Sequence, residues 1–206
     1  MHDSLDDDWV WDNVPPEHLW IFDKLILAKK CGYYAGPVGV AVPHPDWYIV
    51  RPCVHVIGFG LGSERHWIDG ATDNFPLGHF WCEWFSGRHL SVDYSYGKQI
   101  LCVEGHKTDL SLAAHKLTHW DKWTRTDDKV PLPQILDFLK EYPHVNCEFI
   151  GDKLTEVHLR HNPDFRWEQS EYIPVWQEQS TIPPDGYQFV DDPEVHGRIG
   201  AFVRYY

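Results

Sequence analysis

Two glutamates near residue 150 have the type and spacing of metal ligands. Glu148 and Glu156 flank Gly151-Asp152-Lys153, a segment typical of a hairpin turn. A three-residue loop there would set the two carboxylates directly opposite each other on one face of the hairpin. Like charges in that position are destabilising unless a cation lies between them. Because Mg²⁺ usually binds one or two carboxylates together with substrate phosphates, the pair predicts a magnesium site that serves a nucleotide.

The same register would pair Asn146 with His158. Arg160 lies two residues beyond His158 on the same face, where it could contact a phosphate or a carboxylate. Other interpretations of the hairpin stay open. The glutamates could be solvated on an exposed face or paired with nearby lysines, and a two-residue turn would put them on opposite faces.

A glycine-rich segment follows a predicted strand. Residues 47–54 are rich in β-branched and aromatic side chains, and Gly58, Gly60 and Gly62 come next. Glycines let backbone amides approach a phosphate closely, and Arg51 would add positive charge. The spacing matches neither a dinucleotide fingerprint nor a Walker loop. A loop that binds nothing is the alternative interpretation.

Other catalytic patterns find no support in the sequence. The 5 cysteines form no C-x-x-C pair, so we expect reduced, mostly buried thiols. The 14 histidines include no H-E-x-x-H motif, which disfavours a zinc enzyme. A serine nucleophile is also disfavoured, because the chain has no G-x-S-x-G motif.

Composition and charge narrow the class of partner. A chain of 206 residues fits one folding unit, which could be divided into two lobes around a cleft. With 18 Lys and Arg against 31 Asp and Glu, the formal charge of −13 opposes nonspecific binding to nucleic acid or to an anionic membrane. The chain has neither an apolar run of membrane-spanning length nor a basic, apolar start, so we expect a cytoplasmic protein.

The elements that must position these residues are both helical and extended. The apolar spacing over residues 17–30 predicts a helix that stops before Gly32, and residues 133–142 predict a second helix. Turn residues separate three strands that would form a meander, and a hairpin follows the second helix. Residues 1–20 are expected to form an arm, and residues 166–206 a C-terminal extension packed on the domain. The predicted meander and hairpin strands span residues 80–85, 90–94, 99–103, 145–150 and 154–159.

Two segments in the first third of the chain resemble motifs of the ATP-grasp superfamily. Asp23-Lys24, followed by a helix and Gly39-Val40-Ala41-Val42-Pro43, resembles the opening segment whose lysine contacts ATP phosphates. The strand ending in Arg51-Pro52 and the glycine segment 58–62 resemble a strand ending in Lys-Pro and the flap over the phosphates. Arg51 replaces the family's lysine.

Two later segments resemble that family in the same order. The stretch from Glu83 to Asp93 is similar to the hinge that meets adenine and ribose, which implies those contacts for Glu83 and His89. Glu148 with the segment 156–160 resembles the paired metal acids and the E-x-N-x-R ending of carboxylases and carbamoyl-phosphate synthases. His158 stands where the family has asparagine.

The resemblance covers residues 21–165 and implies an α+β, ATP-grasp-like fold. A small lobe at about residues 41–85 would close over a large lobe at about 86–165, with ATP between them. Mg²⁺ would neutralise the phosphates, and Mn²⁺ could replace it. The implied nucleotide ligands are Lys24, Arg51, Gly58, Gly60, Gly62, Glu83 and His89; the implied metal ligands are Glu148, Glu156 and His158; the implied catalytic residues are Lys24 and Arg160.

The reaction that the resemblance implies is ATP-dependent ligation of a carboxylate to an amine or another nucleophile through an acyl phosphate. About twenty residues precede Asp23, so the family's N-terminal substrate domain is expected to be missing, and a partner protein or a second copy would supply the substrate site. Compact chains of this kind resemble products of tailed phages, which would place the protein in the host cytoplasm. A kinase-like reaction and a non-catalytic, acidic interaction protein are the alternatives.

Overall fold

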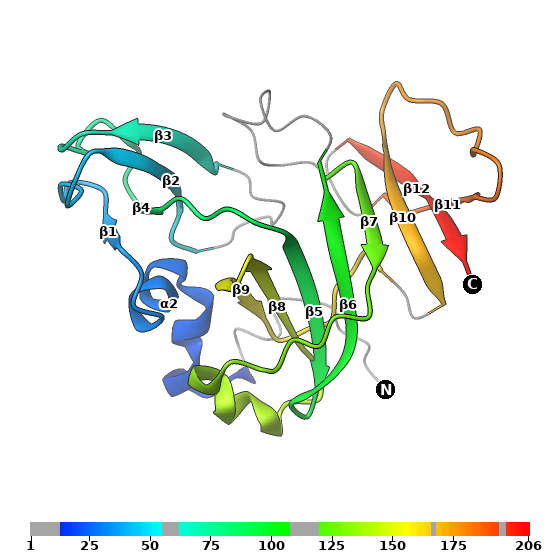
Figure 1. Ribbon diagram of the computed structural model, residues 1–206, viewed down its shortest axis with the longest axis horizontal. Helices are drawn as coiled ribbons and strands as arrows, with labels where there is room; N and C mark the ends of the chain where they lie inside the picture. The colour runs from blue at the N-terminus through cyan, green and yellow to red at the C-terminus, as the bar shows by residue number, and fades with distance from the viewer. Residues whose placement is uncertain (1–12, 55–61, 108–119, 166–167, 194–196) are drawn as a thin grey trace.

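Two antiparallel sheets dominate the computed structural model, which describes residues 13–54, 62–107, 120–165, 168–193 and 197–206 (Figure 1). The small sheet has four strands in the order β1-β4-β2-β3, and the large sheet has eight in the order β11-β12-β10-β7-β6-β5-β8-β9. The strands of the small sheet are β1 (Ala35–Pro37), β2 (Asp46–Pro52), β3 (Glu64–Ile68) and β4 (His79–Glu83). Those of the large sheet are β5 (His89–Ser95), β6 (Lys98–His106), β7 (Lys122–Arg125), β8 (Val145–Ile150), β9 (Lys153–His158), β10 (Gln169–Trp176), β11 (Gln188–Asp191) and β12 (Arg198–Tyr205).

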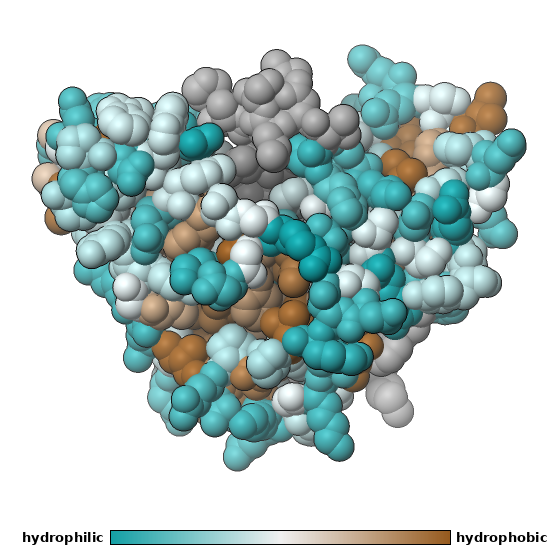
Figure 2. Space-filling model, in the orientation of Figure 1, coloured by the Kyte–Doolittle hydropathy of each residue, from teal (hydrophilic) through white to brown (hydrophobic). Residues whose placement is uncertain are grey.

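Strand β5 has one apolar and one polar face, and this alternation places the polar residues of interest. Leu90, Val92 and Tyr94 point into the main core, which the helices cover. Residues 89, 91 and 93 therefore face the opposite side of the sheet. Strands β8 and β9 repeat the arrangement, with Val145 and Cys147 in the same core. In the face shown in Figure 2, apolar residues gather near the centre, where Figure 1 draws β8 and β9, and hydrophilic residues surround them.

The single helix predicted over residues 17–30 is wrong, because the chain breaks at Asp23. A 3₁₀ helix η1 (Pro16–Phe22) precedes the α-helix α2 (Lys24–Lys30). Asp23 is extended, forms an isolated β-bridge with Val54, and caps α2 by accepting a hydrogen bond from the Ile26 amide at 2.9 Å. The second predicted helix is a 3₁₀ helix, η3 (Gln134–Glu141), which buries Leu136 and Leu139.

The predicted meander is correct for two strands and wrong for the third. Strands β5 and β6 pair, but β4 pairs with β1 and β2 in the small sheet. The chain leaves the small sheet after Glu83 and enters the large sheet at His89. Gly87, with φ of +126°, lies in this connection, where a backbone conformation unsuited to other residues turns the chain from one sheet to the other.

Residues 169–205 extend the large sheet. Strand β10 pairs with β7 on one side and with β12 on the other, and β11 pairs with β12. Their apolar side chains form a second core with the polar-face side of β6, centred on Val103, Tyr172 and Val203. The C-terminal strands are thus continuous with the sheet that carries Glu148 and Glu156.

All 5 cysteines are free, and Cys82, Cys102 and Cys147 are buried, which confirms the prediction of reduced, mostly buried thiols. No helix within the described residues is long and apolar enough to cross a membrane.

The connection at Gly87 leads to a stability prediction. A Cβ atom at Gly87 would lie 2.8 Å from the Cα of Gly151 in the β8–β9 turn, so Gly87→Ala should cost both backbone strain and a clash with backbone. We expect a loss of about 2–4 kcal/mol, or roughly 5–15 °C in melting temperature. Gly78→Ala is the matched control, because Gly78 has φ of +78° but no atom within 4 Å of its Cβ position. Equal losses in both variants would contradict the proposed close contact.

Candidate functional site

The two glutamates lie opposite each other, as predicted from their spacing. Glu148 pairs with Glu156, and Asn146 pairs with His158. The predicted three-residue loop is wrong, however, because Ile150 pairs with Lys153 across a two-residue turn. A β-bulge between the Glu148 and Phe149 pairs adds one residue to β9 and restores the register. The hairpin thereby keeps both carboxylates on the polar face.

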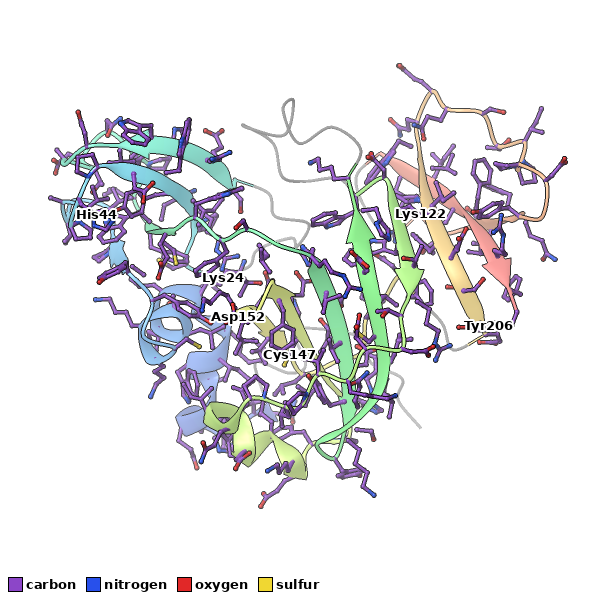
Figure 3. All side chains as sticks on the ribbon, in the orientation of Figure 1. Lys24, His44, Lys122, Cys147, Asp152 and Tyr206 are labelled. Carbon is purple, nitrogen blue, oxygen red and sulfur yellow. The ribbon has the colours of Figure 1, made fainter. Side chains whose placement is uncertain are left out.

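Three cationic or ionisable groups from different elements surround Glu156. Lys24 Nζ lies 3.7 Å and His158 Nε2 3.1 Å from Glu156 Oε1, and Arg51 Nη1 lies 3.9 Å from Glu156 Oε2. Lys24 comes from α2, Arg51 from β2 and His158 from β9, so the small sheet and the first helices meet the large sheet here. Figure 3 shows Lys24 between the small sheet and β9. The exposures of Lys24, Glu156 and His158 are 5%, 8% and 6%.

Burial changes the protonation of Lys24. Removal from water lowers the pKa of this ammonium to about 8, although Glu156 opposes the change and Arg51 adds to it. Lys24 is therefore charged at neutral pH but is held less firmly in that state than an exposed lysine. A buried cation that is easily deprotonated is stabilised by any further negative charge brought to the site.

Glu148 lies beside His89, whose ring packs against two tryptophans. Burial opposes its ionisation, but His89, whose Nε2 lies 3.2 Å from Glu148 Oε2, and the charge of His158 lower the pKa of the carboxyl overall. The His89 ring packs edge-on against Trp120 and Trp123, with centroid separations of 4.3 and 5.5 Å. This places a carboxylate, an imidazole and two indoles side by side on the polar face.

Two polar atoms at the site are buried without a hydrogen bond. The Nδ1 of His89 and the Nε of Arg51 find no hydrogen-bond partner among the described residues, and such buried groups ordinarily have one. A second nitrogen of Arg51 donates to the Thr155 carbonyl at 2.7 Å, which fixes the guanidinium beside Glu156. These donors fit a polyanionic ligand that would complete their hydrogen bonds.

The site offers a metal ion two carboxylate ligands, those of Glu148 and Glu156. Within the described residues, no group of three or more His, Cys, Asp and Glu side chains is arranged to hold a metal ion by itself. Glu148 and Glu156 could supply two oxygen ligands, which is enough for Mg²⁺ when phosphates and water complete the shell. His158, the third predicted ligand, contacts Glu156, and its role as a metal ligand stays a prediction.

A hydrogen-bonded cluster of Ser91, Asp93, Asn146 and Asn162 lies beside the glutamates and is called the floor of the site below. These four residues were not among the predicted site residues. Asn146 donates to Ser91 Oγ and Asp93 Oδ1, both at 2.8 Å, and Asn162 donates to the same two side chains at 2.9 Å. Burial raises the pKa of Asp93 to about 6 despite these donors. The signal was present in Ser91 and Asp93, two polar residues at alternate positions of the strand predicted over residues 90–94.

The remaining predicted site residues lie in different settings. Glu83 is at the end of β4, where its carboxylate accepts a hydrogen bond from the Tyr34 amide at 2.9 Å, on a different strand and in a different sheet from the glutamate pair. Gly58 and Gly60 lie outside the described residues. Gly62 has φ of +76° and lies against Pro52. Arg160 donates to the His161 carbonyl at 3.2 Å and lies near enough to Asp93 to oppose the rise in its pKa.

Comparison with known proteins supports the fold through structure rather than sequence. No protein-family model and no curated protein matches the chain. A crystal structure of a protein provisionally assigned to the ATP-grasp superfamily, from Archaeoglobus fulgidus, matches with a TM-score of 0.51 and 13% identity, covering 91% of this chain and 65% of that one. The ATP-grasp ligase PsnB, complexed with a minimal precursor, matches with a TM-score of 0.39 and 10% identity, covering 73% and 55%; this similarity is too low to support an argument.

The chain therefore has an ATP-grasp-like fold. It spans 65% of the length of the matched protein from Archaeoglobus fulgidus, so the similarity extends to the architecture and not to the activity of a whole protein.

Proposed function

We propose that the chain binds Mg²⁺-ATP between its two sheets and uses it to activate a carboxylate for ligation. The observation that carries this proposal is the position of Glu148 directly opposite Glu156, with Lys24 and Arg51 meeting the pair from other elements. Opposed carboxylates are unfavourable unless positive charge lies close by. The site combines two oxygen ligands with cations that could contact phosphate.

Glu148 and Glu156 would hold the metal, and its charge would offset that of the β- and γ-phosphates. Lys24 and Arg51 would then turn from Glu156 to phosphate oxygens. The unpartnered Nε of Arg51 favours this exchange because a phosphate would satisfy it. His89, whose Nδ1 also has no hydrogen-bond partner among the described residues, would contact the nucleotide from the large sheet.

The chemistry proposed for the site needs no side-chain nucleophile. A carboxylate oxygen of the acceptor attacks the γ-phosphorus, the bond to the β,γ-bridging oxygen breaks, and ADP leaves with an acyl phosphate formed. An amine or other nucleophile then attacks the acyl carbon and expels phosphate. Lys24, Arg51 and Arg160 would orient the reacting groups and balance the charge that develops on them.

Nucleotide binding can be tested by thermal unfolding, because a ligand that binds the folded state stabilises it. At about one hundred times the dissociation constant, Mg²⁺-ATP should add about 2.7 kcal/mol, or roughly 5–10 °C in melting temperature. Mg²⁺ alone and ATP with a chelator are the controls. An unchanged melting temperature in millimolar Mg²⁺-ATP would remove the main support for the proposal.

Ligase activity requires a second substrate, which supplies a further test. Amino acids, small carboxylates and cell extract would be screened for ADP formation that depends on both the chain and the added acceptor. Activity lost in both Arg160→Ala and Glu156→Gln would support ligation. Confirmed ATP binding without acceptor-dependent turnover would favour an interaction protein built on the same fold.

A further inference from the structure

The segment between β9 and β10 is fixed to the floor of the candidate site at its first turn. Asn162 donates its backbone amide to Asp93 Oδ1 and its side-chain amide to Ser91 Oγ, each at 2.9 Å. Its Oδ1 accepts hydrogen bonds from the amides of Asp164 and Phe165 at 2.9 and 3.2 Å. This side chain therefore fixes the bend that follows Arg160.

The same segment is also held two residues later, at Asp164, by an arginine from the C-terminal strands. Arg198 is the first residue of β12, and its side chain is 1% exposed. Its Nη1 lies 2.7 Å from Asp164 Oδ1, and its Nε donates to the Asp192 carbonyl at 3.0 Å. Asp192 in turn accepts a hydrogen bond from the Tyr172 hydroxyl at 2.7 Å. The loop after Arg160 is thus attached directly to β12 and, through Arg198 and Asp192, to Tyr172 of β10.

The charge of Arg160 acts on Asp93 and Asp164, the two aspartates that anchor this segment. Burial raises the pKa of Asp93 and of Asp164, and the positive charge of Arg160 acts against the rise at each carboxyl. Arg160 is two residues from Asn162 and four from Asp164 in the chain, so the contacts of these two residues set the position of its backbone. A displacement of either aspartate would therefore move the loop that carries Arg160.

Stability alone gives a weak reason for burying Arg198 with Asp164. Taking both charges out of water costs several kcal/mol, and well-packed apolar residues often serve stability equally well. An ion pair differs from an apolar contact in fixing direction and register. The main effect of the ion pair between Arg198 and Asp164 is therefore to fix the conformation of the loop.

We propose that Arg198 and Asp164 are positioning residues that hold Arg160 toward the transferring phosphoryl group. This inference rests on the proposed function, because it assigns Arg160 a ligand in the nucleotide site. The C-terminal strands do not line the site, but under this proposal they influence it through the loop that carries Arg160.

The test separates positioning from stability by using an apolar replacement. Arg198→Met alone leaves Asp164 buried without its partner and should unfold at lower temperature, whereas Asp164→Leu with Arg198→Met should recover much of that loss. The functional probe is inorganic phosphate, titrated calorimetrically into the complex of each protein with Mg²⁺-ADP. Arg204→Met is the matched control, since Arg204 lies on the same strand but is 43% exposed.

We expect Mg²⁺-ADP affinity to change less than twofold, and phosphate affinity to fall about tenfold in Arg160→Ala, in Arg198→Met and in the stabilised double variant. Arg204→Met should bind phosphate as the wild type does. Wild-type phosphate affinity in the double variant, or in Arg160→Ala, would overturn the inference.

Hydrogen exchange keeps the two proposals distinguishable. If the wild type fails to bind Mg²⁺-ADP, the proposed function is wrong, but the loop can still be examined. Amides of residues 160–165 should exchange at least tenfold faster in the double variant at matched stability. Unchanged protection there would show that the ion pair does not fix the loop.

Discussion

Replacing both Glu148 and Glu156 by glutamine should abolish metal-dependent nucleotide binding. Each substitution removes a bond to the metal, and such a bond should contribute at least as much as a hydrogen bond to a charged group, which is worth about 1.5–3 kcal/mol. The affinity for Mg²⁺-ATP is therefore expected to fall at least about 100-fold. Titration calorimetry with Mg²⁺ and a nonhydrolysable ATP analogue measures the loss.

The double substitution should also destabilise the nucleotide-free protein. From the sequence alone, removing two opposed negative charges would relieve repulsion. The structure reverses that expectation, because Lys24 lies 3.7 Å and Arg51 3.9 Å from Glu156. Without the carboxylates, the buried ammonium of Lys24 loses the counter-charge of Glu156, which costs about 3 kcal/mol and lowers the melting temperature by roughly 5–10 °C.

Asp152→Asn is the matched control for this experiment. Asp152 lies in the turn of the same hairpin, but its side chain is 85% exposed, so its neutralisation should change neither stability nor nucleotide affinity measurably. A double variant that binds Mg²⁺-ATP as tightly as the parent would show that the glutamates are not the metal ligands. A double variant that is more stable than the parent would show that repulsion dominates in the nucleotide-free site.

The parts of the site that could be predicted from the sequence are those set by strand alternation. The period of two in β8 and β9 put Glu148 and Glu156 opposite each other and Asn146 opposite His158. The bulge that makes this register compatible with a two-residue turn could not be predicted, because it depends on how β9 packs: Leu154 and Val157 both enter the main core, although they are three residues apart.

Long-range pairing explains most of what the sequence did not predict. The apolar pattern of residues 17–30 is helical throughout, yet Asp23 is drawn into an extended conformation by its bridge to Val54. Likewise, the strand at residues 79–83 has the composition of its neighbours but pairs in the other sheet. Propensity describes each segment, while partners distant in the sequence decide its final conformation.

Lys24→Met should weaken Mg²⁺-ATP binding about 10–100-fold at neutral pH, because one charge-assisted contact to phosphate is lost. Arg51 and His158 remain beside Glu156, and methionine fits the buried site, so the variant should fold. Lys29→Met, which removes an exposed lysine from the same helix, is the control and should bind as the parent does.

The pH dependence of the Lys24 variant identifies the buried ammonium directly. The pKa of Lys24 is about 8 in the folded protein and 10.5 when unperturbed, so between these values the unfolded chain binds more protons at this residue than the folded one. Stability contributed by Lys24 must then rise with pH in this window. Relative to Lys24→Met, the free energy of unfolding of the wild type should increase by about 2 kcal/mol from pH 8 to 9.5.

Over the same range the nucleotide affinity of the wild type should fall, because deprotonation removes the charge that contacts phosphate, and the affinities of the two proteins should approach each other. Denaturant unfolding and nucleotide titration at each pH measure both trends. Other titrating groups, including the buried thiols, are common to both proteins and cancel in the comparison. Parallel curves for wild type and Lys24→Met across pH 8 to 9.5 would mean that the ammonium is not held at the low pKa that burial beside Arg51 requires, and that it is free to titrate as an ordinary surface lysine.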